Sequence, residues 1–310
     1  MTAEPWAVPE PVRDPVVAAR TVVVNGIAMS ALVASVHDPR AVIVAIHGGA
    51  ARAAYFDCPG HPEYSLLRLG ASLGFTVIAL DRPGYGASAD HAAALVSPQS
   101  RVDATYAAID ALLRDDERGA RVFLWAHSIG CELAVRTAAD ERGGELLGVE
   151  LAGTGVEHQP LARQILGTHE GNAAPAGVRK LLWEPAVLYP QSIIGGAAFA
   201  SPTPPFEGSA IRSWPTDFPR LAPNVAVPVH FSAAQYEHVW RRDADGLDTV
   251  AKLFDSAPRV EVSTIAGAGH NLSIGHAAVA YHLRIMAFIE ECLVLRSFPE
   301  LASEGTETNS

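Results

Sequence analysis

Short apolar runs alternate with longer helical patterns along most of the chain, and this alternation limits the folds open to it. The runs at residues 41–46 (AVIVAI), 75–80 (FTVIAL) and 121–126 (RVFLWA) are almost continuously apolar, as strands buried on both faces are. Between the last two runs, apolar residues recur at spacings of three and four from Val102 to Leu113, which indicates an amphipathic helix. The alternation predicts an α/β fold: a mostly parallel sheet with helices on both faces.

Further elements are expected on either side of these runs. Residues 21–24 and 31–36 predict a β-hairpin that turns at Asn25-Gly26. The other predicted helices span residues 63–73, 129–140, 247–254 and 276–295, and the other predicted strands span residues 148–152, 225–231 and 260–265.

The alternation stops after residue 155 and resumes at residue 225. Nine of the 22 prolines fall between Pro185 and Pro228, and no strong strand pattern occurs before residue 225. We therefore predict one α/β core interrupted by a mainly helical lid and flanked by flexible, Pro-rich or polar tails. The predicted boundaries are 1–17 (tail), 18–155 and 225–298 (core), 156–224 (lid) and 299–310 (tail).

Composition excludes several classes of partner. The formal net charge is −11 and no basic cluster stands out, which argues against nucleic acid and against anionic membrane surfaces. Three cysteines without CxxC spacing exclude a disulfide framework, and the absence of HExxH and of an early GxGxxG argues against a metal and a dinucleotide cofactor. With no secretory signal and no long aliphatic run, we expect a soluble, cytoplasmic protein without membrane insertion.

Ser128 stands where the strand at 121–126 meets the next helix, and it carries the sharpest chemical signal. In Ala126-His127-Ser128-Ile129-Gly130, small residues lie two positions to either side of the serine. A serine in a tight strand-to-helix turn projects its hydroxyl above the sheet, and bulky neighbours would collide there. The free N–H groups of the helix then face any anion that forms at the serine. The alternative interpretation is an ordinary helix N-cap.

This pentapeptide resembles the G-x-S-x-G nucleophile elbow of the α/β-hydrolases, with Ala126 in place of the first glycine. The resemblance implies the α/β-hydrolase fold and a histidine base after the last strand. Gly267-Ala268-Gly269-His270 matches the family's Gly-x-Gly-His pattern there, so His270 is the expected base, with His276 as its nearest competitor. Relatives with an aspartate nucleophile are disfavoured, because the elbow holds a serine.

The resemblance also implies an acid after the first strand that follows the lid. Counting nine residues from Pro228 in the family's pattern leads to Glu237, where aspartate is the usual residue. Three alternatives stay open: Glu157, after an earlier strand, and the nearby Asp243 and Asp245. With Glu237 the chain order is serine, acid, histidine, as in the family.

An oxyanion hole is implied after the strand at 41–46, where His47-Gly48-Gly49-Ala50 resembles the family's HG-x loop. The N–H group of Ile129, together with that of Gly49 or alternatively Ala50, is expected to bind the oxyanion. Arg82 and Tyr85, in a segment that resembles the family's D-x-x-G-x-G-x-S turn, are expected at the rim of the site. The residues expected to line the substrate pocket are Ala50, Trp183, Tyr189 and Trp214.

Together these residues predict a serine esterase or thioesterase. Ser128 would attack a carboxylic ester or thioester, His270 would accept its proton, Glu237 would orient the imidazole, and an acyl-enzyme would form. The expected partner is a small molecule with an apolar portion, and no cofactor is expected. Two alternatives stay open: acyl transfer, cyclisation or C–C bond cleavage by the same serine, and a non-catalytic ligand-binding protein. The oligomeric state is not predicted.

Overall fold

The computed structural model describes residues 15–113, 118–166 and 175–298. The predicted C-terminal tail, 299–310, lies outside the described residues, as does the predicted N-terminal tail apart from its last three residues.

Eight strands form one sheet in the order β1-β2-β4-β3-β5-β6-β7-β8. Strand β1 pairs antiparallel with β2, and β2 antiparallel with β4, whereas every other neighbouring pair is parallel. The predicted mostly parallel sheet is therefore confirmed. The strands are β1 (Ala18–Val24), β2 (Ile27–Ala34), β3 (Val42–Ile46), β4 (Thr76–Leu80), β5 (Val122–His127), β6 (Gly148–Ala152), β7 (Val229–Tyr236) and β8 (Val260–Gly269).

The predicted helices are also present, with shifted ends. The α-helices are α1 (Leu66–Ser72), α2 (Pro98–Leu112), α3 (Gly130–Ala138), α4 (Pro160–Leu166), α5 (Val178–Trp183), α6 (Glu207–Leu221), α7 (Ala244–Ala251) and α8 (Ala278–Ser297). Short 3-10 helices are η1 (Ala53–Phe56), η2 (Pro62–Tyr64), η3 (Gly86–Leu95), η4 (Gly143–Glu145), η5 (Ala186–Leu188), η6 (Ala197–Phe199), η7 (Ala222–Asn224) and η8 (Leu272–Ile274). None of the helices in the described ranges has the length and apolarity that crossing a bilayer requires.

Two local features explain where predicted elements begin and turn. The β1–β2 hairpin turns at Asn25 and Gly26, both with positive φ, as the tight hairpin turns require. Strand β7 begins at Val229 and not at the predicted Val225, because Pro228 has no N–H to donate to the neighbouring strand.

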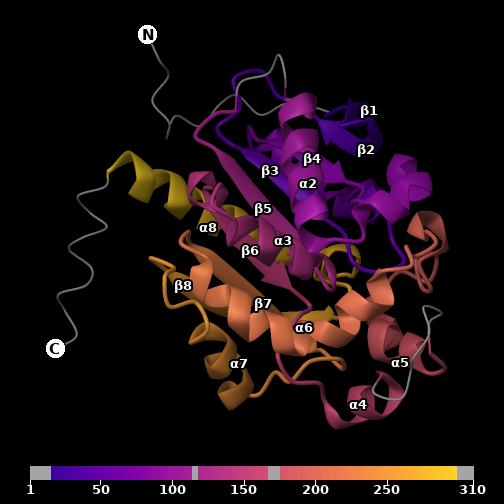
Figure 1. Cartoon of the computed structure of the whole chain (residues 1–310). Coiled ribbons are helices and arrows are strands. Elements are labelled where there is room, and N and C mark those ends of the chain that lie inside the picture. The colour runs from indigo at the N-terminus through magenta and orange to yellow at the C-terminus, as the bar shows by residue number, and fades with distance from the viewer. Residues whose placement is uncertain (1–14, 114–117, 167–174, 299–310) are drawn as a thin grey trace, which may run out of the picture.

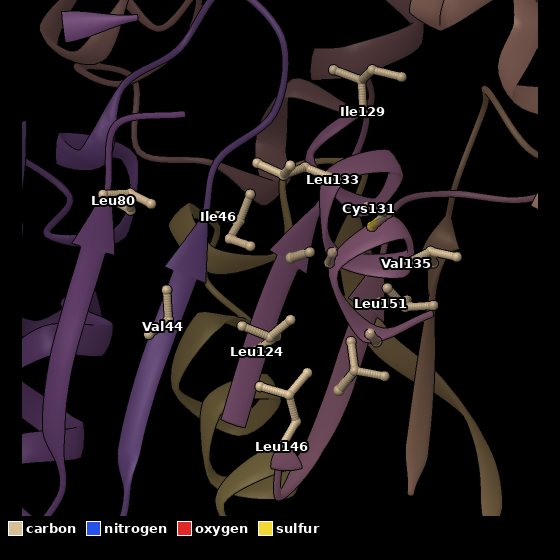
Figure 2. Close-up of a cluster of buried hydrophobic side chains, with 14 of the residues drawn as sticks. Val44, Ile46, Leu80, Leu124, Ile129, Cys131, Leu133, Val135, Leu146 and Leu151 are labelled. Atoms are coloured by element: carbon tan, nitrogen blue, oxygen red, sulfur yellow. The ribbon is translucent and has the colours of Figure 1, made fainter. Parts of the chain in front are cut away.

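The central strands are buried on both faces because alternate side chains enter two separate cores. Val42, Val44 and Ile46 pack in one core with residues of α2, α3 and α6, whereas Ile43 and Ala45 pack in the other with residues of α1 and α8. Figure 1 shows α2 and α3 on one side of the sheet and α8 on the other. Figure 2 shows side chains of the first core on β3, β4, β5 and β6 beside those of α3.

The chain between β6 and β7 interrupts the α/β alternation. Its described part contains α4, α5 and α6 and no strand of the sheet, and α4 and α5 lie outside the two helical layers (Figure 1). Helix α6 is amphipathic and packs on α3 through Trp214 and Phe218, which belong to the first core. This packing joins the inserted segment to the sheet.

Leu124, in the middle of β5, tests the first core. Its side chain is fully buried between strands and α3 (Figure 2), so Leu124→Ala leaves a cavity and should lower the free energy of unfolding by about 2–5 kcal/mol. Leu283→Ala is the matched control, because Leu283 on α8 is 48% exposed, and it should change stability by no more than about 0.5 kcal/mol. Urea unfolding measures both, and equal stabilities for the two variants would contradict this core.

Candidate active site

Ser128 occupies a strained turn between β5, which ends at His127, and α3, which begins at Gly130. Its φ is +54°, in the left-handed region that residues with a side chain rarely adopt. The N–H of Ser128 donates to the carbonyl of Ala152 at the end of β6, 2.8 Å away. This bond holds the turn at the carboxyl edge of the parallel strands.

Gly130 shows why the turn needs small residues. A Cβ atom at this position would lie 2.4 Å from the carbonyl oxygen of His47 and 2.7 Å from that of Ile46. The start of α3 therefore packs directly against the backbone at the end of β3.

Three predicted residues meet at this turn. His270 follows β8, Glu237 follows β7, and both loops reach Ser128 because neighbouring parallel strands end at the same edge of the sheet. The hydroxyl of Ser128 lies 3.1 Å from Nε2 of His270. Nδ1 of the same ring lies 3.0 Å from each carboxylate oxygen of Glu237. The geometry matches a nucleophile, base and orienting acid.

The Glu237 carboxylate is buried yet favours its charged form. Burial alone raises its pKa, but the charge and hydrogen bond of His270 and the N–H of Val239, which donates to Oε1 at 2.8 Å, together hold the pKa below the usual value. Glu237 can therefore keep the proton of His270 on Nδ1 and leave Nε2 free to accept the proton of Ser128.

His127 braces the loop that carries His270. Its Nε2 donates to the backbone carbonyl of His270, 2.9 Å away, and its ring stacks on Tyr55. Burial lowers the pKa of His127 to about 3, so the ring is neutral at pH 7. His127 therefore supports the His270 loop and takes no part in proton transfer at that pH.

The loop after β3 offers backbone donors beside the serine. A Cβ on Gly48 would lie 3.0 Å from Cβ of Ser128, so the loop backbone lies against the nucleophile. Among the described residues, no acceptor is bound to the N–H of Gly49 or of Ile129, the predicted oxyanion donors. The N–H of Ala50 is occupied, since it donates to the hydroxyl of Tyr85.

The competing residues have other partners. Glu157 is paired at the surface with Arg163 and Arg241, and the Asp243 side chain caps α7 by accepting the N–H of Gly246. His276 is hydrogen-bonded to the hydroxyl of Tyr64. None of the three side chains is hydrogen-bonded to Ser128 or His270.

A cavity of about 520 Å³ opens onto Ser128 and His270, and its walls are mostly apolar. Three of the residues predicted to line it do so: Ala50, Trp183 and Trp214. The prediction for Tyr189 is wrong. Its side chain packs behind the His270 loop, where its hydroxyl accepts the N–H of Asn271 at 3.2 Å.

The predicted rim position of Arg82 and Tyr85 is also wrong. The two residues are 5% and 0% exposed. Both are bonded to the carboxylate of Glu207 at the start of α6, a residue that the sequence did not indicate. No local pattern marks Glu207, since an acidic residue in the first turn of a helix is common. Within the described ranges, no cluster of three or more His, Cys, Asp or Glu residues could hold a metal ion.

Comparison with known proteins agrees with this architecture. The model of the alpha/beta hydrolase family matches residues 43–281, which is more than half of the chain. None of the curated protein sequences compared with the chain matches it.

Solved structures with the same fold have low sequence identity. A membrane phospholipase A described as a bacterial virulence factor has a TM-score of 0.63 at 16% identity, covering 89% of this chain and 86% of its own. A thermostable carboxyl esterase from Bacillus coagulans has a TM-score of 0.63 at 16% identity, covering 89% and 99%. A mutant of the N-acyl homoserine lactonase AidH has a TM-score of 0.61 at 17% identity, covering 89% and 98%. At such identities the likeness shows the fold alone.

Gly130→Ala tests the packing beneath the serine. The added methyl group would collide with two backbone oxygens that cannot move without displacing β3, so we expect the free energy of unfolding to fall by at least about 2 kcal/mol. Gly144→Ala is the control, because a Cβ there would meet nothing within 4 Å. Urea unfolding of both variants measures the difference, and a Gly130→Ala protein as stable as the control would contradict the described packing.

Proposed function

The chain belongs to the alpha/beta hydrolase family, and from that premise we propose that it is a serine hydrolase of carboxylic esters or thioesters. The observation that supports the proposal most strongly is a continuous series of hydrogen bonds through three side chains. It runs from the Ser128 hydroxyl to Nε2 of His270 at 3.1 Å and from Nδ1 to the Glu237 carboxylate at 3.0 Å. An ordinary N-cap serine has no reason to face a buried histidine that is itself bound to a buried carboxylate.

The proposed reaction follows from this series of hydrogen bonds. As Oγ of Ser128 attacks the substrate carbonyl, Nε2 of His270 takes the hydroxyl proton and Glu237 stabilises the imidazolium. The carbonyl oxygen becomes an oxyanion that the N–H groups of Gly49 and Ile129 bind. His270 then gives its proton to the departing alcohol or thiol, which leaves an acyl group on Ser128. A water molecule, deprotonated by His270, attacks the acyl group, releases the acid and restores the serine.

The cavity supports a substrate with an apolar portion. Its wall includes Trp183, Phe199 and Trp214, all from the chain between β6 and β7, and a mostly apolar wall favours an acyl chain or an apolar alcohol. We propose that residues 156–224 act as the lid of this cavity. The carboxyl esterase and the lactonase of similar fold act, by their names, on esters and lactones, which is consistent with carbonyl chemistry on this fold.

Ser128→Ala tests the nucleophile. Without the hydroxyl, no acyl-enzyme can form, and kcat for p-nitrophenyl esters of graded acyl length should fall by at least about 10³-fold. Labelling by a fluorophosphonate probe, which reacts with activated serines, should disappear in the same variant. Wild-type turnover by Ser128→Ala would exclude the proposal. Detection of the free acid as product by mass spectrometry would support hydrolysis over acyl transfer.

Glu237→Gln tests the orienting acid against its competitors. An amide cannot stabilise the imidazolium and favours the wrong tautomer, so kcat should fall by about 10³–10⁴-fold. The matched controls are Glu157→Gln and Asp243→Asn, whose carboxylates have partners away from His270, and their kcat should stay within about threefold of wild type. A large loss in either control, with Glu237→Gln active, would reassign the acid.

A further inference from the structure

The carbonyl of Gly48 is fixed by two hydrogen bonds. Nδ1 of His47 donates to it at 2.8 Å, and Nη2 of Arg82 donates to it at 3.1 Å. His47 can donate through Nδ1 because its Nε2 accepts the backbone N–H of Arg82 at 3.1 Å. Burial and the nearby Arg82 charge hold the pKa of His47 well below its usual value, so this neutral form is the one present at pH 7.

The orientation of the Gly48 carbonyl determines the direction in which the Gly49 N–H points. Gly48 C=O and Gly49 N–H belong to one planar trans peptide, in which the two groups point in opposite directions. Because the Gly48 oxygen is held toward Arg82, the Gly49 N–H points away from Arg82. That N–H is the donor to which the proposed function assigns the oxyanion.

The Arg82 guanidinium is in turn held by Glu207. Nη2 of Arg82 lies 2.6 Å from Oε2 of Glu207, and both side chains are buried. The Tyr85 hydroxyl donates to Oε1 of Glu207 and accepts the N–H of Ala50 at 3.2 Å. The Glu207 carboxylate, in the first turn of α6, thus ties the loop after β3 to the loop after β4.

The positive charge of Arg82 has a second effect, because it offsets the negative charge of the Glu207 carboxylate. A Cβ on Gly49 would lie 2.9 Å from Oε1 of Glu207, so the carboxylate lies against the proposed oxyanion hole. If the Glu207 carboxylate were unpaired, its negative charge would repel the oxyanion that forms on the substrate. The ion pair with Arg82 offsets this charge, and the carboxylate still accepts hydrogen bonds from Arg82 and Tyr85.

We propose that Glu207 is a positioning residue of the oxyanion hole, which aims the Gly49 N–H through Arg82 and steadies the next peptide through Tyr85. The inference rests on the proposed serine hydrolase function. It assigns to the segment between β6 and β7 a part in transition-state stabilisation, in addition to forming the wall of the cavity.

Glu207→Gln tests the proposal. The neutral amide no longer pairs with the Arg82 charge and offers one oxygen in place of two, so the Arg82 guanidinium or the Tyr85 hydroxyl must reorient. Because losing one oxyanion donor outright costs about 10²–10³ in kcat, misplacing one should lower kcat about ten- to a hundredfold and leave KM within about threefold. The Ki of an alkyl trifluoromethyl ketone should rise by a similar factor, since its adduct with Ser128 places an oxyanion in the same hole.

Asp217→Asn is the matched control. Asp217 is a second carboxylate on α6 that pairs with a partly buried arginine, Arg136, at 2.8 Å, but it has no bond to the loop after β3. Its kcat and ketone Ki should stay near wild type. Wild-type kcat and Ki in Glu207→Gln, or equal losses in Asp217→Asn, would overturn the proposal.

Two further measurements keep the test decisive. If Glu207→Gln does not fold, Tyr85→Phe removes the Tyr85 bonds alone and should show the same pattern to a smaller degree, and wild-type kcat and Ki there would overturn the proposal. Labelling of Ser128 by a fluorophosphonate is measured in parallel on the wild-type protein. Suppose that the probe labels the wild-type protein and that turnover depends on Ser128, but that kcat is unchanged in Glu207→Gln. This result would refute the positioning role of Glu207 and leave the proposed function standing.

Discussion

The close packing of the turn at Ser128 against the end of β3 is the constraint on which the site depends. Gly130 brings the start of α3 against the carbonyls of Ile46 and His47, and the Ser128 N–H is bound by the end of β6. These contacts hold the serine in a left-handed conformation that an isolated chain would avoid. The same contacts place the loop after β3, with the free N–H of Gly49, beside the hydroxyl.

Much of the fold and part of the site follow from local sequence. Strands buried on both faces are recognisable because both sets of alternating side chains are apolar, and the turn at Ser128 is recognisable because only small residues fit around it. His270 and Glu237 could be placed because the segments around them, Gly267–His270 and the stretch that begins at Pro228, resemble patterns of the α/β-hydrolase family. Tyr189, Arg82 and Tyr85 were misplaced because their surroundings come from distant segments, and Glu207, 125 residues from Arg82 along the chain, could not be recognised at all.

The Arg82–Glu207 pair adds little to stability by itself. Removing both charges from water offsets most of their attraction, and a well-packed apolar pair of similar size is often as stable. The ion pair instead orients the Arg82 guanidinium, because a guanidinium held by a carboxylate has its remaining N–H groups at set angles. Here one of them meets the Gly48 carbonyl. The strained backbone of Ser128 lowers stability and the ion pair beside Gly49 adds little to it, yet the proposed chemistry depends on both.

In the proposed function, Ser128 carries the acyl group during turnover. Rapid acid quenching of the wild-type protein with an excess of a p-nitrophenyl ester, followed by intact mass measurement and peptide mapping, tests it directly. If Ser128 is the nucleophile, the mass of the protein increases by that of the acyl group, the added mass lies on the peptide that contains Ser128, and it forms together with a burst of nitrophenolate. Burst turnover with the acyl group on another residue, or steady turnover with the serine modified by neither ester nor fluorophosphonate, would contradict it.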